Sequence, residues 1–238
     1  MKNIFKMMGI ALLACSMVMV SCNKNDDDDT TNNGGNGGNG GNGGNGGNTT
    51  PTATYSATWD GQAMTLAVAE GFYYNLGNEN AQLAGLEMFT FIGAAGLTSE
   101  EYDLPMVQCN AARYQGSYTI AEQLGLGRYF PCAAYVDANE VSWLPQALKA
   151  NPTFGTFDAT NHTFGFDYAV QLYNTVEWNE AFVQVLANDG YTVEDAQDFD
   201  DETYDSYVAA ADALTTMKDI TVNVANVVFT PSTYFAAE

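Results

Sequence analysis

Positive charge is scarce in this chain. Its 238 residues carry seven Lys and Arg against 29 Asp and Glu, which gives a formal net charge of −22 at pH 7. After residue 53, only four cations remain against 25 acids. Nucleic acids and anionic lipid headgroups are themselves densely negative, so such a surface repels both. The composition therefore excludes nucleic acid as a partner.

Histidine is also nearly absent, which limits the catalytic chemistry that the chain can offer. The one histidine, His162, follows Asn161 in a predicted turn, and no serine lies in a nucleophile-elbow motif. Two carboxylates could hydrolyse a glycosidic bond, but the spacing of the acids singles out no pair. The sequence leans against an enzyme and leaves glycan hydrolysis as a third-ranked function.

The N-terminal apolar run is too short to cross a membrane, which takes about 20 residues. It spans residues 7–20 and follows Lys2 and Lys6. A positive start before a short apolar core is typical of a secretory signal peptide. We expect residues 1–21 to be such a peptide.

The run closes with Met19-Val20-Ser21-Cys22, which resembles the lipobox of bacterial lipoproteins. The resemblance implies that Cys22 is acylated and becomes the new N-terminus, with outer-membrane lipid as its partner. Each buried CH₂ of an acyl chain contributes about 0.8 kcal/mol, so more than one chain gives a stable anchor.

An acidic run, Asp26–Asp29, follows the anchor cysteine. It resembles the export signal of Bacteroidetes-type surface lipoproteins, which implies an outer-membrane protein on the extracellular side. The alternative is a solvated acidic spacer on a lipoprotein that faces the periplasm. Five Gly-Gly-Asn triplets then fill residues 34–48. Without apolar side chains they cannot offset the entropy of ordering, so we assign residues 22–53 to a flexible linker and 54–238 to one β-rich domain.

Two hairpins are visible in this domain. Residues 54–59 and 62–68 flank Asp60-Gly61, a strong hairpin signal, and residues 153–157 and 163–170 flank a turn at 158–162. Further strands are expected at 86–92, with both faces covered, and at 219–229. Helical spacing of apolar residues predicts helices at 177–188 and 201–217, and Pro145 favours a short third helix over 144–151.

We therefore expect a mainly β fold, with α+β as the broader alternative. Its form would be an antiparallel β sandwich or barrel carrying a helical insertion near 177–217. This β-rich pattern resembles the lipocalin-like or calycin-like barrels found among such lipoproteins. A barrel interior lined by Phe89, Phe91, Phe164 and Phe166 could hold an apolar ligand.

Four cysteines are present, and two of them lie in the domain. Outside the cytoplasm disulfides persist, so we predict a bridge between Cys109 and Cys132, worth roughly 3 kcal/mol in the chain-entropy model. Two buried thiols are the alternative.

Two weaker groups of candidate ligand-binding residues remain. Asp198, Asp200 and Glu202 alternate within the densest acidic segment, and hard cations bind such oxygens, so calcium is the one cofactor that the sequence suggests. The alternative is a helix N-terminus with favourable charges. Tyr73, Tyr74, Tyr129 and Trp143 fall in predicted loops or strand ends and could stack on a sugar. The alternative is that most of these rings belong to the core.

The leading hypothesis is a cell-envelope lipoprotein whose non-catalytic domain binds an extracellular glycan or another small molecule. Such a domain should gather exposed aromatics on one concave face. The alternative is a structural or interaction protein of the cell surface, in adhesion or envelope assembly, with an unidentified protein partner. That function predicts a flat apolar patch or an open edge strand.

Overall fold

A computed structural model of the chain describes residues 52–79, 83–99 and 101–232. These residues belong to one compact unit, Pro51–Glu238. The predicted signal peptide, Cys22, the acidic run and nearly all of the linker lie outside the described residues. Within them, no helix has the length and apolar character that a membrane span needs.

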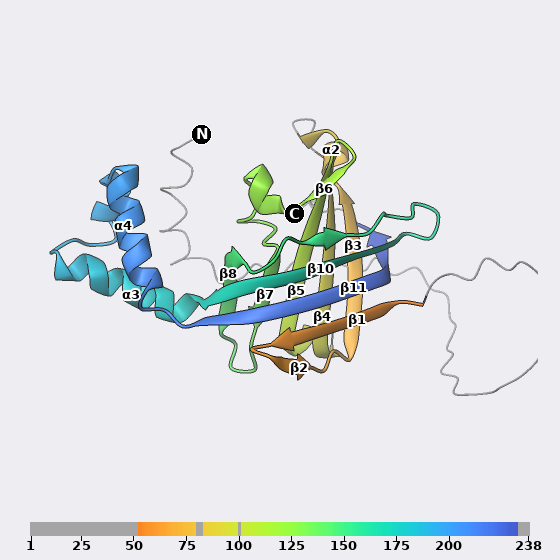
Figure 1. The fold of residues 1–238 in the computed structure, drawn as a ribbon, viewed down its shortest axis with the longest axis horizontal. Helices are drawn as coiled ribbons and strands as arrows, with labels where there is room; N and C mark the ends of the chain where they lie inside the picture. Colours follow the sequence, from red (N-terminus) through yellow and green to blue (C-terminus); the bar gives the residue numbers. More distant parts are fainter. Residues whose placement is uncertain (1–51, 80–82, 100, 233–238) are drawn as a thin grey trace, which may run out of the picture. The chain divides into compact units, whose positions relative to one another are not determined.

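The fold is mainly β, as expected from the sequence (Figure 1). The strands are β1 (Thr54–Trp59), β2 (Gln62–Met64), β3 (Val68–Asn75), β4 (Leu86–Thr98), β5 (Glu101–Tyr114), β6 (Ser117–Thr119), β7 (Ala133–Val136), β8 (Ser142–Leu148), β9 (Thr153–Phe154), β10 (Thr163–Asn174) and β11 (Met217–Pro231). The helices are α2 (Leu76–Glu79), α3 (Thr175–Asn188) and α4 (Asp201–Asp212), with short 3₁₀ turns η2 (Ala121–Leu124) and η3 (Asp195–Asp198).

Seven of the strands close into a ring. The order β11-β3-β4-β5-β7-β8-β10 is completed by the pairing of β10 with β11. Strands alternate in direction around an antiparallel ring, so an odd number forces one parallel pair. That pair is β3 with the end of β11, where Gly71 lies opposite Phe229. The fold is thus a barrel, antiparallel except at this one seam.

The barrel interior is filled by the protein's own aromatic rings. Phe89 and Phe164 lie with ring centroids 4.4 Å apart, and Phe229 packs edge-on against both, at 5.8 and 5.7 Å. These rings belong to the main core, whereas Leu86 and Met88 of the same strand, β4, face a second apolar cluster. Both faces of β4 are therefore covered, as predicted. The four phenylalanines expected to line a ligand cavity instead take part in the core packing.

The predicted helical insertion is the connection between β10 and β11. Figure 1 shows these strands side by side, with α3 and α4 joined to one end of the pair, and Tyr173 pairs with Met217 where the helices begin and end. Helix α3 starts at Asn174, whose side chain accepts hydrogen bonds from the backbone N–H groups of Val176 and Glu177. Trp178, Phe182 and Leu186 of α3 pack with residues of α4 in a separate small core between the two helices.

Two local predictions are wrong. Residues 144–151 do not form a helix, because β8 pairs with β10 through this segment, and the register shifts beside Pro145, which has no N–H to donate. Pairing within the sheet outweighs the local helix signal here. The second helix ends at Asp212, short of 217, and Leu214 is consequently exposed and does not lie on the packed face.

The seam of the ring depends on a residue without a side chain. A Cβ added to Gly71 would lie 2.7 Å from the backbone oxygen of Val228 and 2.9 Å from the Phe229 ring. We expect Gly71→Ala to lower the free energy of unfolding by roughly 1–3 kcal/mol, because the seam must open to admit the methyl group. Urea unfolding followed by circular dichroism measures this loss.

Gly155→Ala is the matched control, because its added Cβ would meet no atom closer than 3.3 Å. Equal destabilisation by both variants would show that the close approach at the seam is unimportant.

Candidate ligand-binding site at one end of the barrel

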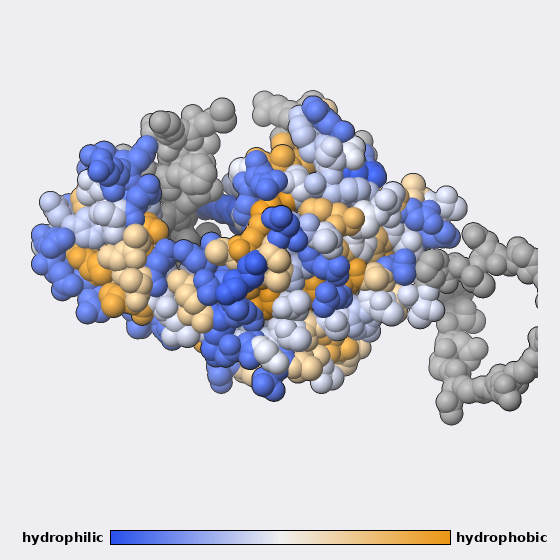
Figure 2. Space-filling view, viewed as in Figure 1, coloured by the Kyte–Doolittle hydropathy of each residue, from blue (hydrophilic) through white to orange (hydrophobic). Residues whose placement is uncertain are grey.

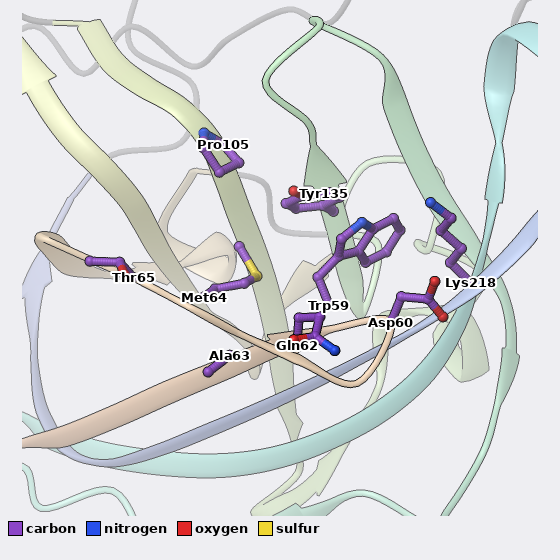
Figure 3. Close-up of a pocket in the computed structure, with 9 residues that line it drawn as sticks. All are labelled: Trp59, Asp60, Gln62, Ala63, Met64, Thr65, Pro105, Tyr135 and Lys218. Atoms are coloured by element: carbon purple, nitrogen blue, oxygen red, sulfur yellow. The ribbon is translucent and has the colours of Figure 1, made fainter.

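One end of the barrel carries a hollow of about 400 Å³ (Figure 3). Ligand pockets typically enclose about 300–1,000 Å³ and favour the mouths of β-barrels. The lining residues come from β1, β2, β5, β7, β11 and the turns beside them: Trp59, Asp60, Gln62, Ala63, Met64, Thr65, Pro105, Tyr135 and Lys218. We call this the Trp59 hollow. Asp60, Gln62 and Thr65 are exposed, so the hollow opens to solvent.

Closely packed aromatic rings form its inner wall. Trp59 and Tyr135 lie with ring centroids 4.2 Å apart, and Trp143 packs edge-on against Trp59 at 4.9 Å. Trp143 is held from behind, because its Nε1 donates to Asp137 at 3.3 Å. Aromatic pairs of this kind contribute about 0.5–1.5 kcal/mol beyond the area they bury, so the wall is preformed.

A cation faces the same wall. Lys218 shares the inward phase of β11 with Ile220 and Val222, which belong to the core. Its Nζ lies 5.6 Å from the centroid of the Trp59 ring and 5.2 Å from that of Trp143. Figure 3 shows the Trp59 indole between the Tyr135 ring and the Lys218 side chain. Such a cation is attracted to the electron-rich ring faces.

Three residues of the hollow, Trp59, Tyr135 and Lys218, are not among the candidates identified from the sequence. Trp59 ends a strand just before the Asp60-Gly61 turn, and both turn residues have positive φ. Lys218 is a charged residue at a position of β11 where the alternation of the strand places apolar side chains. This departure from the pattern could have identified it from the sequence. Tyr135 gives no such signal, because its place opposite Trp143 depends on how β7 and β8 pair.

The four predicted aromatic ligand residues do not come together. Trp143 backs the Trp59 hollow, whereas Tyr74 is only 2 % exposed in the second apolar cluster. Tyr129 is 59 % exposed, and the Arg128 guanidinium lies over its ring. Tyr73 stacks on Phe157 within the barrel. The four residues therefore do not form one exposed concave face, and Trp143, behind the hollow, is itself buried.

An ion pair lies at another position on the inward side of the ring. Glu87 accepts hydrogen bonds from Tyr73 Oη and from Arg113 Nε, and Arg113 also approaches the Tyr118 hydroxyl. Burial alone would raise the pKa of Glu87, but the two hydrogen bonds and the Arg113 charge outweigh it, and the net pKa lies below its usual value. Burial and the bond to Glu87 raise the pKa of Tyr73 to about 12.

Of the three predicted calcium ligands, Asp200 acts as a helix cap. The Asp200 side chain caps α4 by accepting from the backbone N–H of Thr203 at 2.7 Å, Asp198 ends η3, and Glu202 lies in the first turn of α4. In the described part of the chain, no three His, Cys, Asp or Glu side chains are grouped to hold a metal ion. The geometry thus matches the alternative of a capped helix N-terminus.

Cys109 and Cys132 are both buried and both carry free thiols in the structure. They are close in the fold, because Cys109 pairs with Ala133 and the N–H of Asn110 donates to the Cys132 carbonyl at 3.2 Å. Burial raises the pKa of both thiols. The bridge between them stays a prediction for the chain in an oxidising compartment.

Replacing Glu87 should remove a pH-dependent part of the stability. The folded-state pKa lies below the unfolded value, so this contribution is present above about pH 4.5 and is lost as the pH falls through the folded-state pKa. We expect Glu87→Gln to lower the free energy of unfolding by roughly 1–3 kcal/mol at pH 7, and by less at pH 3. Urea unfolding at both pH values measures the two losses, with a substitution of the exposed Glu101, Glu101→Gln, as control. An equal loss of stability at pH 7 and pH 3 would contradict the prediction.

The oxidation state of the buried cysteines can be measured directly. Protein purified from an oxidising compartment should show no alkylation at Cys109 or Cys132 in denaturant until a reductant is added. Peptide mass mapping of the alkylated chain separates these two from Cys15 and Cys22. Full alkylation of both without reductant would instead establish buried thiols, which should then react slowly in the folded protein because burial raises their pKa.

The chain was compared with models of known protein families, with curated proteins and with solved structures, and none of them matches it. No family membership follows, and the Trp59 hollow has to be interpreted from its own geometry.

Proposed function

We propose that this chain is a lipid-anchored protein of the cell envelope whose barrel binds an extracellular glycan, or another small molecule, in the Trp59 hollow. The observation that carries the proposal is the half-buried Trp59 ring, packed on the buried Tyr135, beside the polar groups of Asp60, Gln62 and Lys218. A concave, mostly apolar surface with a few polar groups is the usual composition of a small-molecule site. Sugar rings combine an apolar face with hydroxyl groups and match both parts.

The anchor and the location follow from the N-terminal pattern. The lipobox-like residues at 19–22 support acylation of Cys22, and the aspartates after it support the extracellular side of the outer membrane. The Gly-Gly-Asn linker would let the barrel reach ligands beyond the lipid surface. Binding in the hollow needs no contact with the membrane.

A glycan hydrolase receives less support from this hollow. Hydrolysis usually requires two carboxyl groups on either side of the scissile bond. Asp60 is the only acid among the nine residues that line the hollow. Binding without cleavage is therefore the better interpretation of its chemistry.

One observation favours the alternative of an interaction protein. Orange, hydrophobic side chains gather over α3 and α4 in the space-filling view (Figure 2). The exposed apolar residues include Val176 and Val183 of α3, and Leu214 just after α4. A protein partner could cover such a surface. A domain that binds no small molecule would move the proposal to this surface.

The test is binding of oligosaccharides and fatty acids to the chain with Trp59 replaced. We expect Trp59→Ala to weaken binding of the recognised ligand by about tenfold or more, because it removes the stacking wall, and Gln62→Ala to weaken it less. Isothermal titration calorimetry gives the affinities, and thermal melting verifies that each variant is folded.

Tyr129→Ala is the matched control, since it removes another exposed aromatic ring that lies outside the hollow. Loss of binding in this variant, with Trp59→Ala unaffected, would place the site at the Arg128–Tyr129 pair. Absence of binding to every compound would contradict a small-molecule function.

A further inference from the structure

The four cations of the domain differ in whether a carboxylate neutralises them. Arg113 pairs with Glu87, and Lys149 pairs with Asp219 at 3.2 Å. Arg128 lies over an exposed tyrosine ring. Lys218 enters no ion pair with any of the residues that the structure describes, although the domain holds 25 acids. Its charge is left facing the Trp59 hollow.

The acids near Lys218 do not neutralise it. Asp137 is occupied, because Oδ1 accepts from the backbone N–H groups of Asn139 and Val141 at 2.8 and 3.0 Å, and Oδ2 accepts from Trp143. Asp60 lies on the exposed turn at the rim of the hollow and forms no ion pair with Lys218. An ammonium group offers three hydrogen-bond donors. The Lys218 Nζ lies beside the Trp59 and Trp143 rings and is paired with no carboxylate among the described residues.

We propose that the Trp59 hollow selects acidic sugars, with the sugar against the exposed part of the Trp59 indole and its anionic group on Lys218. This inference rests on the proposed function and names the class of ligand. A charge-assisted hydrogen bond from an ammonium group to a carboxylate or sulfate is roughly twice as strong as a neutral one. Asp60 and Gln62 remain to bind the hydroxyl groups that acidic and neutral sugars share.

The negative charge of the domain adds a condition to this selectivity. A domain with 25 acids and four cations repels anions at long range, and this repulsion is screened beyond about 8 Å at 0.15 M salt. Lys218 acts at contact distance, where screening is weak. Short acidic oligosaccharides should therefore bind at physiological salt. The salt screens the repulsion from the distant acids, whereas the contact with the Lys218 ammonium group is little affected.

The experiment compares three matched probes on the full chain by calorimetry at 0.15 M salt. They are a galacturonic acid trisaccharide, a sulfated galactose trisaccharide and the neutral galactose trisaccharide. We expect at least one acidic probe to bind about tenfold more tightly than the neutral one, the fold-change that one charge-assisted hydrogen bond supplies. The preferred probe shows whether carboxylate or sulfate is the natural group.

Variants then assign the preference to one side chain. Lys218→Met should remove the advantage of the acidic probe and leave the neutral probe nearly unchanged, whereas Lys218→Arg should retain it. Lys149→Met is the matched control, because it deletes the same charge at a site that pairs with Asp219. If Lys218→Met does not fold, the comparison of probes on the unaltered chain still decides.

The outcomes distinguish charge selectivity from sugar binding. Equal binding of acidic and neutral probes overturns the charge selectivity and leaves the sugar site in place. Equal weakening of all probes by Lys218→Met also overturns the selectivity, because it shows that Lys218 only packs against the wall. If none of the three probes binds, the selectivity for acidic sugars is overturned. If the other oligosaccharides and fatty acids fail as well, the proposed function is overturned with it.

Discussion

Strand β11 supplies the pairing that the rest of the barrel depends on. One of its edges pairs with β10 from Met217 to Val228, and the other is shared between β1 at its start and β3 at its end. Since the ring has seven strands, its last pairing has to be parallel, and Gly71 allows the two backbones to meet there. With this strand in place each of the seven strands of the ring has a neighbour on both sides.

Filling the barrel with aromatic rings determines where polar chemistry can occur. Phe89, Phe164 and Phe229 occupy the interior and exclude charged groups, because burying an unpaired charge is costly. Inward-facing charged residues therefore lie toward the ends of their strands. Glu87 and Arg113 neutralise each other, and Lys218 rests on indole rings beside an open hollow. A packed interior and charged groups near the strand ends are thus two results of the same constraint.

Local patterns predicted more of the fold than of the site. Asp60-Gly61, the alternating residues of β11 and the amphipathic face of α3 each depend on neighbours in sequence, and each prediction is confirmed. The helix expected over 144–151 is wrong because pairing between β8 and β10 overrides the local signal. The hollow combines residues of five strands. Which residues meet there depends on long-range strand register, which no local pattern contains. Lys218 is the exception, because a charged residue at an inward-facing position of β11 is visible in the sequence.

The place of β11 in the chain has a consequence for assembly. Its partners include β1, which begins at Thr54 and lies outside the closed ring, so the first and last of the described strands pair side by side. During synthesis, β1 and β3 are made before β11, the strand that pairs with both of them. Contacts so distant in sequence are slow to form. The ring of strands can consequently close only after residues 217–231 have been synthesised.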